Sequence, residues 1–341
     1  MIQKNYLKVL AVILIATFPL QALAQSQSIN PGFNPNKIID DSVFIDTQTF
    51  GGAEGIQKFL ESKNSILART SPDFLQKLKE PTITLLKVAL DDPRPNLGRL
   101  RTAAEIIWDA SQSSGLNPQV IIVKLQKEQS LITGHGEDSP ERLQRALDFS
   151  LGFGCPDSTG CKDSLYPGFY FQLFGNLDAG GNRYVGAAKS LMKSFNTEGG
   201  RGPAVNGKIS KVGDVITLDN TLGGYEGVLS QQSIQLSNKS TAALYRYTPH
   251  IYNGNYNFWK FFNEWFRYPN GTLVKLTGDA NLYVIQNGYR QLVPGFVAQA
   301  RKFDTTKTVA VSPNEIQSYP QGKLLGPEDN TVVKVEGDTH T

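Results

Sequence analysis

The chain has 341 residues, of which 40% are hydrophobic and 19% charged, and this balance excludes a disordered protein. At roughly 100–200 residues per domain, the length predicts one or two globular domains. Lysines and arginines number 34 against 31 acids and form no basic run, so a nucleic-acid partner is not expected.

The first 24 residues predict an export signal. Lys4 and Lys8 form a positively charged region before an apolar run over residues 9–20, and Ala22-Leu23-Ala24 supplies the small residues of a cleavage site before Gln25. The alternative is an uncleaved membrane anchor, but about 12 apolar residues are too few to cross a hydrocarbon core of about 30 Å. We therefore expect a secreted, periplasmic or cell-surface protein that keeps no stable membrane span after cleavage.

Residues 25–100 predict a partly helical N-terminal extension. Residues 25 to about 50 are polar and rich in Asn and Pro, which is typical of an extended segment. Ile56, Phe59 and Leu60 then follow helical spacing, and an apolar series over residues 75–90 is interrupted by Pro81. Residues 92–95, Asp-Pro-Arg-Pro, mark a break before the next element.

Two successive helices are predicted between residues 102 and 133. Thr102 and Glu105 have the spacing of a capping box, and Gly115 is placed to end the first helix. Asn117-Pro118 starts the second helix, with Asn as the cap and Pro at the first helical position. Residues 120–123 are all aliphatic, which predicts burial on every side, and the helix turns polar afterwards. We expect this helix to leave the core at a surface or cleft.

Glu128 lies where this second helix leaves the core, on the same face as Ile121, Leu125 and Ile132. Burial and the negative end of the helix dipole would both raise the pKa of its carboxyl, as a proton donor near neutral pH requires. The alternative is a solvated contact with Lys124, one helical turn earlier.

Both cysteines of the chain, Cys155 and Cys161, lie in one short loop, and an oxidising compartment predicts a disulfide between them. Closing so small a loop would stabilise the fold by about 2 kcal/mol. A zinc site would need more ligands than these cysteines and three scattered histidines, and no metal or cofactor is expected. A nucleophilic pair of Cys155 with His250 is a further alternative, although oxidation by the second cysteine would compete with it.

The later part of the chain alternates loops, helices and strands. Residues 134–183 are expected to be mostly loop, helical spacing returns over 185–195, and a strand-like pattern follows over 212–216. A helix is expected over 257–266, with one aromatic face that is typical of a core: Phe258, Phe261, Phe262, Trp265 and Phe266. Tyr245 and Tyr247 are less regular and could face a cleft or the core.

From Gly271 the pattern predicts β-structure. Apolar residues over 273–276 and 282–285 flank turn residues, and Asn287-Gly288 indicates a two-residue hairpin. We expect a small β-rich module over residues 271–327 and a loose polar tail over 328–341. The predicted fold class is α+β, with a mainly α-helical part over 101–268 followed by this module.

Four segments together resemble a known group of domains. They are residues 103–107 (AAEII), 115–129 (GLNPQVIIVKLQKEQ), 152–157 (GFGCPD, with Cys161) and 242–250 (AALYRYTPH). These segments resemble the lysozyme-like domains of secreted bacterial proteins, which include soluble lytic transglycosylases and goose-type lysozymes. The likeness covers about residues 100–267, and residues 33–67 resemble the N-terminal extension of a hemagglutinin-like branch.

The resemblance implies cleavage of a β-1,4 glycosidic bond in peptidoglycan, with Glu128 as the general acid and base. It places Tyr245 and Tyr247 beside the saccharide, and Gln129 and Asp148 are further candidates for substrate contact. A hydrolase would also need a second carboxylate, for which Asp148, Asp157 and Asp163 are candidates. A lytic transglycosylase works without one, and this activity is the preferred expectation.

The chain departs from the lytic transglycosylase pattern in ways that favour a second hypothesis. Gln129 stands after the glutamate where Ser is usual, Arg246 replaces a small polar residue, and Gly-Leu-Met-Gln is missing. The alternative is a non-catalytic glycan-binding or adhesion protein on the same fold. The C-terminal module would then anchor the chain to wall polymer through Tyr283 and Tyr289, or serve only as a stabilising appendage.

Overall fold

The fold is mixed α+β, as the sequence predicts. The computed structural model describes residues 32–70, 101–135, 139–156, 160–161, 166–175, 185–219, 230–268, 271–286, 289–311, 313–317, 319 and 321–328. The expected signal segment, the apolar series over 75–90, the break at 92–95 and the tail after residue 328 lie outside these ranges.

Helices dominate the chain before residue 268, with two small hairpins between them. The elements before residue 200 are α1 (Asp41–Phe44), α2 (Ala53–Ser62), the 3-10 helix η1 (Ile66–Thr70), α5 (Ala103–Ser114), α6 (Pro118–Gln129), α7 (Pro140–Asp148), α8 (Phe169–Phe174) and α9 (Ala187–Asn196). The hairpins pair β1 (Ala204–Val205) with β2 (Lys208–Ile209) and β3 (Val215–Asp219) with β4 (Gln231–Gln235). After them come α10 (Lys239–Tyr247), the π-helical segment η2 (Ile251–Tyr256) and α11 (Asn257–Phe266).

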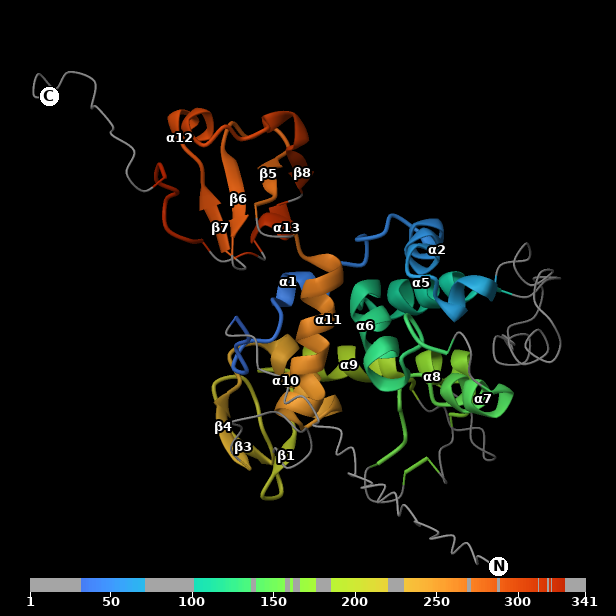
Figure 1. Ribbon diagram of the computed structural model, residues 1–341. Helices are drawn as coiled ribbons and strands as arrows, with labels where there is room; N and C mark the ends of the chain where they lie inside the picture. The colour runs from blue at the N-terminus through green and yellow to red at the C-terminus, as the bar shows by residue number, and fades with distance from the viewer. Residues whose placement is uncertain are drawn as a thin grey trace, which may run out of the picture.

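Helix α6 lies between other helices, with α5 and α11 packed against it (Figure 1). Its aliphatic residues 120–123 are all buried, which confirms the expected burial on every side. The predicted caps are present on both helices. Thr102 and Glu105 form a complete capping box, Gly115 ends α5 with a positive φ of 82°, and Asn117 caps α6 through the amide N–H of Gln119.

The N-terminal segment is part of the core, which differs from the extended lead-in expected for residues 25–50. Ile38, Ile39 and Phe44 are buried in the main hydrophobic cluster. The segment is also bound to α10, because Thr241 Oγ1 accepts from the amide of Ile38 at 2.9 Å and Asp41 Oδ1 accepts from the amide of Ser240 at 2.9 Å. These apolar residues follow no helical or strand period, so sequence patterning does not indicate their burial.

The aromatic face of α11 belongs to the core, as predicted. Phe258 and Phe262 are buried in the main cluster, and Phe261, Trp265 and Phe266 pack against it while partly exposed. Among the described residues, no helix is long and apolar enough to span a membrane.

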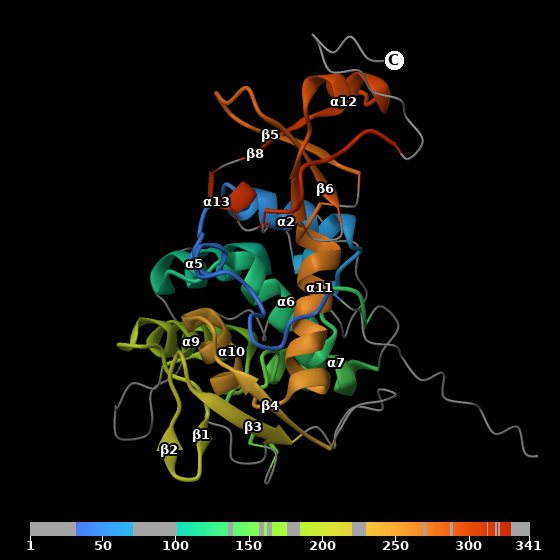
Figure 2. The same cartoon turned by 90° about the vertical axis from the view of Figure 1, so that its left-hand side faces the viewer.

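The C-terminal module is built on a four-stranded sheet with the order β7-β6-β5-β8. Its elements are β5 (Leu273–Leu276), β6 (Leu282–Gln286), β7 (Tyr289–Leu292), α12 (Gly295–Ala300), the 3-10 helix η3 (Thr305–Lys307), β8 (Val309–Val311) and α13 (Pro313–Gln317). Antiparallel pairing brings Gln286 opposite Tyr289, with two residues between the strands, as the hairpin signal predicts. Figure 2 shows α12 at the outer end of the module and α13 at the end nearer the helices.

Alternate residues of β5 and β6 lie on opposite faces of the sheet, and each face packs against one helix of the module. Leu273 and Val284 pack with Val297 of α12, whereas Val274 and Ile285 pack with Ile316 of α13. The module is thus covered by helices on both faces of its sheet and is less purely β than expected. Tyr289 is 48% exposed, whereas Tyr283 is partly buried against the second of these clusters.

Candidate functional site

Glu128 lies in the last turn of α6, where the helix leaves the core. The helix ends at Ser130, which adopts a left-handed conformation with φ 54°. The side chain of Glu128 is 20% exposed. Its environment is therefore partly buried, as the helical pattern predicts.

Two lysines bind one oxygen of this carboxylate. Lys124 Nζ lies 2.6 Å and Lys127 Nζ 2.9 Å from Glu128 Oε1, and their side chains are 3% and 6% exposed. Both ammonium groups also donate to Thr248 Oγ1 at the end of α10, at 3.3 Å and 2.9 Å. Lys124 Nζ stands 3.7 Å from the ring centroid of Tyr247, within cation–π range. The result is a nearly dry cluster of two cations, one anion, a hydroxyl and an aromatic ring.

This cluster corrects the expected direction of the Glu128 pKa. Burial by itself raises the pKa, but the charges of Lys124 and Lys127 and their hydrogen bonds outweigh burial and lower it to about 2. The contact with Lys124 exists, but it is mostly buried rather than solvated. Burial lowers the pKa of Lys124 to about 7, against the opposing charge of Glu128. Burial and the nearby charge of Glu128 raise the pKa of Tyr247.

The second carboxylate oxygen faces a neighbouring loop. Gly152 has a positive φ of 61°, and a Cβ built there would lie 3.4 Å from Glu128 Oε2. Buried Gln172 of α8 holds this loop, because its Oε1 accepts from the amides of Leu151 and Phe153 at 3.2 Å and 2.9 Å. Tyr247 OH donates to the carbonyl oxygen of Leu151 at 2.7 Å, so the loop is tied to α10 as well.

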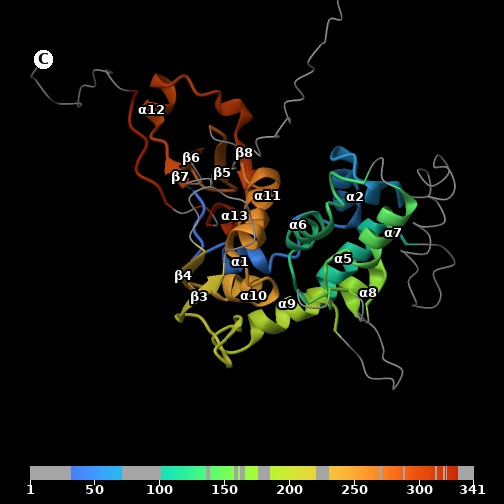
Figure 3. The same ribbon diagram turned by 60° about the horizontal axis from the view of Figure 1, so that its bottom comes forward.

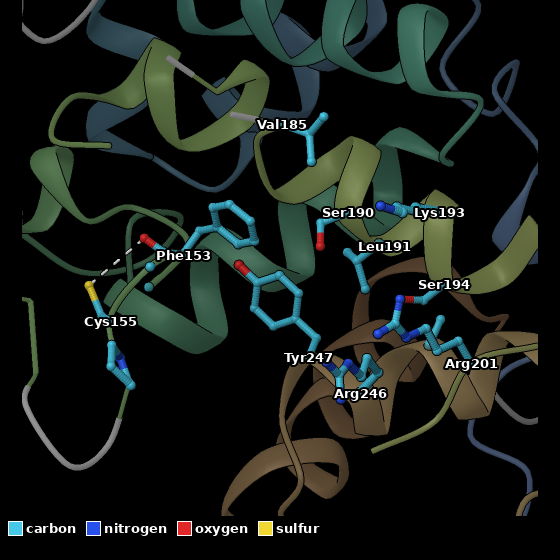
Figure 4. A pocket seen from close by; sticks show the side chains of 14 residues that line it. Phe153, Cys155, Val185, Ser190, Leu191, Lys193, Ser194, Arg201, Arg246 and Tyr247 are labelled. Carbon is cyan, nitrogen blue, oxygen red and sulfur yellow. Dashed lines mark hydrogen bonds between the residues drawn. The ribbon is translucent and has the colours of Figure 1, made fainter. Parts of the chain in front are cut away.

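A cavity of about 430 Å³ lies next to this loop (Figure 4). It lies between the loop, α9 and α10, and it is lined by residues 152–156, Val185, Ser190, Leu191, Lys193, Ser194, Arg201, Ala243, Arg246 and Tyr247. The rings of Phe153 and Tyr247 stack in its wall, with centroids 6.0 Å apart. Figure 3 shows α9 running beside α10 on the same side of the molecule.

The structure brings some of the predicted site residues to this cavity and leaves others away from it. Tyr247 lines it. Tyr245 does not, because it is completely buried and its hydroxyl donates to the carbonyl of Pro35 at 3.0 Å. On α10 these tyrosines are two residues apart and point in different directions, so only one of them can reach the cavity. Glu128 is adjacent to the cavity wall at Gly152 but is not one of the lining residues.

The remaining candidates for substrate contact also lie off the cavity lining. Asp148 ends α7, where its Oδ1 accepts from Gln144 at 2.8 Å, and burial raises the pKa of its carboxyl. Gln129 is partly exposed, and its carbonyl oxygen contacts the ring of His135. Asp157 and Asp163 lie outside the described residues.

Cys155 and Cys161 form the predicted disulfide. Cys155 also lines the cavity, so the bond closes the loop next to it. Since both thiols are consumed, the alternative of a Cys155 and His250 nucleophilic pair is wrong for this structure.

The sequence does not predict that Lys127, Thr248 and Arg201 belong to the site. Residues one position apart on a helix do not normally face each other, so Lys127 gives no signal as a partner of Glu128. Its contact depends on Thr248, which is 121 residues later in the chain. Arg201 lies in the connection between α9 and β1 and belongs to no recognisable motif. Comparison of the chain with protein-family models, with curated proteins and with solved structures finds no match.

Proposed function

We propose that this protein is exported and binds the glycan strands of bacterial peptidoglycan on a lysozyme-like domain, without cleaving them. The proposal rests on one observation. Three of the four segments that resemble lysozyme-like domains lie next to one another in the structure. The end of α6, the loop at Gly152 and the end of α10 surround Glu128 and the adjacent cavity.

The cavity has the properties that saccharide binding requires. Its volume of about 430 Å³ lies in the usual range for small-ligand sites. The stacked rings of Phe153 and Tyr247 offer an apolar wall, while Ser190, Ser194 and the basic side chains offer hydrogen-bond donors.

The charge state of Glu128 favours binding over cleavage. A general acid works best when its pKa lies near the working pH. The charges of Lys124 and Lys127 hold the pKa of Glu128 well below neutral pH, so its carboxyl is ionised at pH 7. Two ammonium groups on Oε1 stabilise the ionised form, so Glu128 lacks the proton that a glycosidic oxygen would need.

Cleavage by Glu128 is the second candidate function, and the position of Oε2 favours it. Both lysines bind Oε1, whereas Oε2 faces the Gly152 loop beside the cavity. A sugar that displaced the lysines from the carboxylate would raise its pKa and restore the general acid of a muramidase or lytic transglycosylase.

Incubation with purified sacculi separates the two functions. The bound fraction is measured by cosedimentation, and soluble products are analysed by mass spectrometry. We expect the chain to sediment with sacculi and to release no muropeptides, with Glu128→Gln behaving in the same way wherever it remains folded. Release of anhydro- or reducing-end muropeptides by the unaltered chain, abolished in Glu128→Gln, would establish cleavage and overturn the binding proposal.

A further inference from the structure

One end of the cavity has a concentration of positive charge. Lys193 of α9, Arg201 and Arg246 of α10 line it, and no described lining residue is acidic. Figure 4 shows the side chains of Arg201 and Arg246 next to each other, away from the ring of Phe153. A small cavity with three cations and no lining acid among the described residues is electrostatically suited to an anion.

Among the described residues, these cations have no carboxylate partner. In the described part of the chain, no ion pair joins Lys193, Arg201 or Arg246 to a carboxylate. Arg201 Nε is buried and has no hydrogen-bond partner there. Burial and the neighbouring charge of Arg201 lower the pKa of Arg246. A buried guanidinium N–H without a partner is unfavourable, and a ligand oxygen would satisfy it.

The opposite end of the cavity has a different chemistry. There the rings of Phe153 and Tyr247 stack against each other and offer an apolar surface. A ligand that fills both ends therefore combines a ring that can lie on an aromatic surface with an anionic group. A planar carboxylate fits the donor fork of a guanidinium better than a point charge would.

We infer that this cavity binds a sugar acid, with the carboxylate at Arg201 and Arg246 and the sugar ring against Phe153 and Tyr247. The expected binding of an anion follows from the residues that line the cavity and does not depend on the proposed function. The identity of the ligand rests on the proposed function, because the lactyl group of muramic acid carries a carboxylate wherever no stem peptide is attached to it. The site would then distinguish peptide-free muramic acid from peptide-linked muramic acid and from N-acetylglucosamine.

The test is calorimetric titration of the purified chain at low ionic strength. The ligands are N-acetylmuramic acid, its uncharged carboxamide, N-acetylglucosamine and inorganic phosphate. We expect the acid to bind at least 10-fold more tightly than the carboxamide or N-acetylglucosamine. Arg246→Gln should remove this preference and is exposed enough to leave the fold intact, and Arg201→Gln should do the same. Lys208→Gln, which makes the same charge change at the exposed β1–β2 hairpin, should keep the preference.

The outcomes separate this inference from the proposed function. Equal binding of acid and carboxamide, or a preference that survives Arg246→Gln, would overturn the sugar-acid site even if sacculi still bind. Phosphate binding as tight as the acid, lost in the same variants, would show a general anion site and would also overturn it. A carboxylate preference that depends on the arginines supports the inference, including the case in which the chain fails to bind intact sacculi.

Discussion

Replacement of Glu128 by Gln distinguishes a structural ion pair from a catalytic acid. The substitution keeps the shape of the side chain and removes its charge, leaving Lys124 and Lys127 with side chains only 3% and 6% exposed. Breaking a buried ion pair on one side typically costs 3–5 kcal/mol, because each remaining partner must either stay charged while buried or lose its proton. The amide oxygen of Gln still accepts a hydrogen bond, so the expected loss of unfolding free energy is about 3 kcal/mol, near the lower end of that range.

Thermal and urea denaturation at pH 7 measure this loss. At about 2–4 °C per kcal/mol for a domain of 150–250 residues, the melting temperature should fall by roughly 6–12 °C. Glu264→Gln is the matched control, because Glu264 is an exposed glutamate on α11, and it should change stability by less than about 0.5 kcal/mol. A second variant in which Glu128, Lys124 and Lys127 are all replaced by Leu or Met should regain most of the loss, since an apolar cluster has no unpaired charge.

An unchanged or higher stability of Glu128→Gln would contradict a stabilising role of the ion pairs. If Glu128→Gln is as stable as the unaltered chain, or more stable, the lysines do not stabilise the carboxylate in solution. A stability gain on removing a buried carboxylate is the behaviour expected of a strained catalytic acid. Glu128 would then again be the candidate general acid.

Two further changes test the neighbourhood of Glu128. Burial lowers the pKa of Lys124 to about 7 from an ordinary value of 10.5, so between these pH values the unfolded chain binds more protons and stability rises with pH. Lys124→Met should remove a rise of up to a few kcal/mol between pH 7 and 10 in urea denaturation, and an unchanged slope would contradict a buried Lys124. Gly152→Ala should lower stability by about 1–2 kcal/mol, because φ is 61° and the new methyl group meets Glu128 Oε2; equal melting temperatures would show that the loop relaxes freely.

The sequence predicts the parts of the fold that depend on neighbouring residues. The capping box at Thr102, the left-handed Gly115 and the Asn117-Pro118 start of α6 are all local arrangements, and each is present. The burial of residues 120–123 follows from an aliphatic run that has no polar face. The Cys155–Cys161 disulfide follows from having two cysteines in one loop.

The sequence fails where an environment is assembled from distant segments. The pKa of Glu128 depends on Lys127 and Thr248, and the hydroxyl that binds both lysines comes from the end of α10. Tyr245 is buried by the N-terminal segment through Pro35, which is 210 residues earlier. The basic end of the cavity combines Arg201 with Arg246 from two elements that no motif connects. Periodicity places a residue on a face of its own helix, but it does not identify the charges that approach that face.

A carbon-13 NMR titration of the Glu128 carboxyl carbon, assigned by comparison with Glu128→Gln, measures the property that decides between binding and cleavage. The two lysines on Oε1 predict that this carboxyl stays ionised down to about pH 3 and titrates near pH 2. A midpoint above pH 5 would show a protonated carboxyl available near neutral pH and would contradict the account in which the two lysines keep Glu128 ionised.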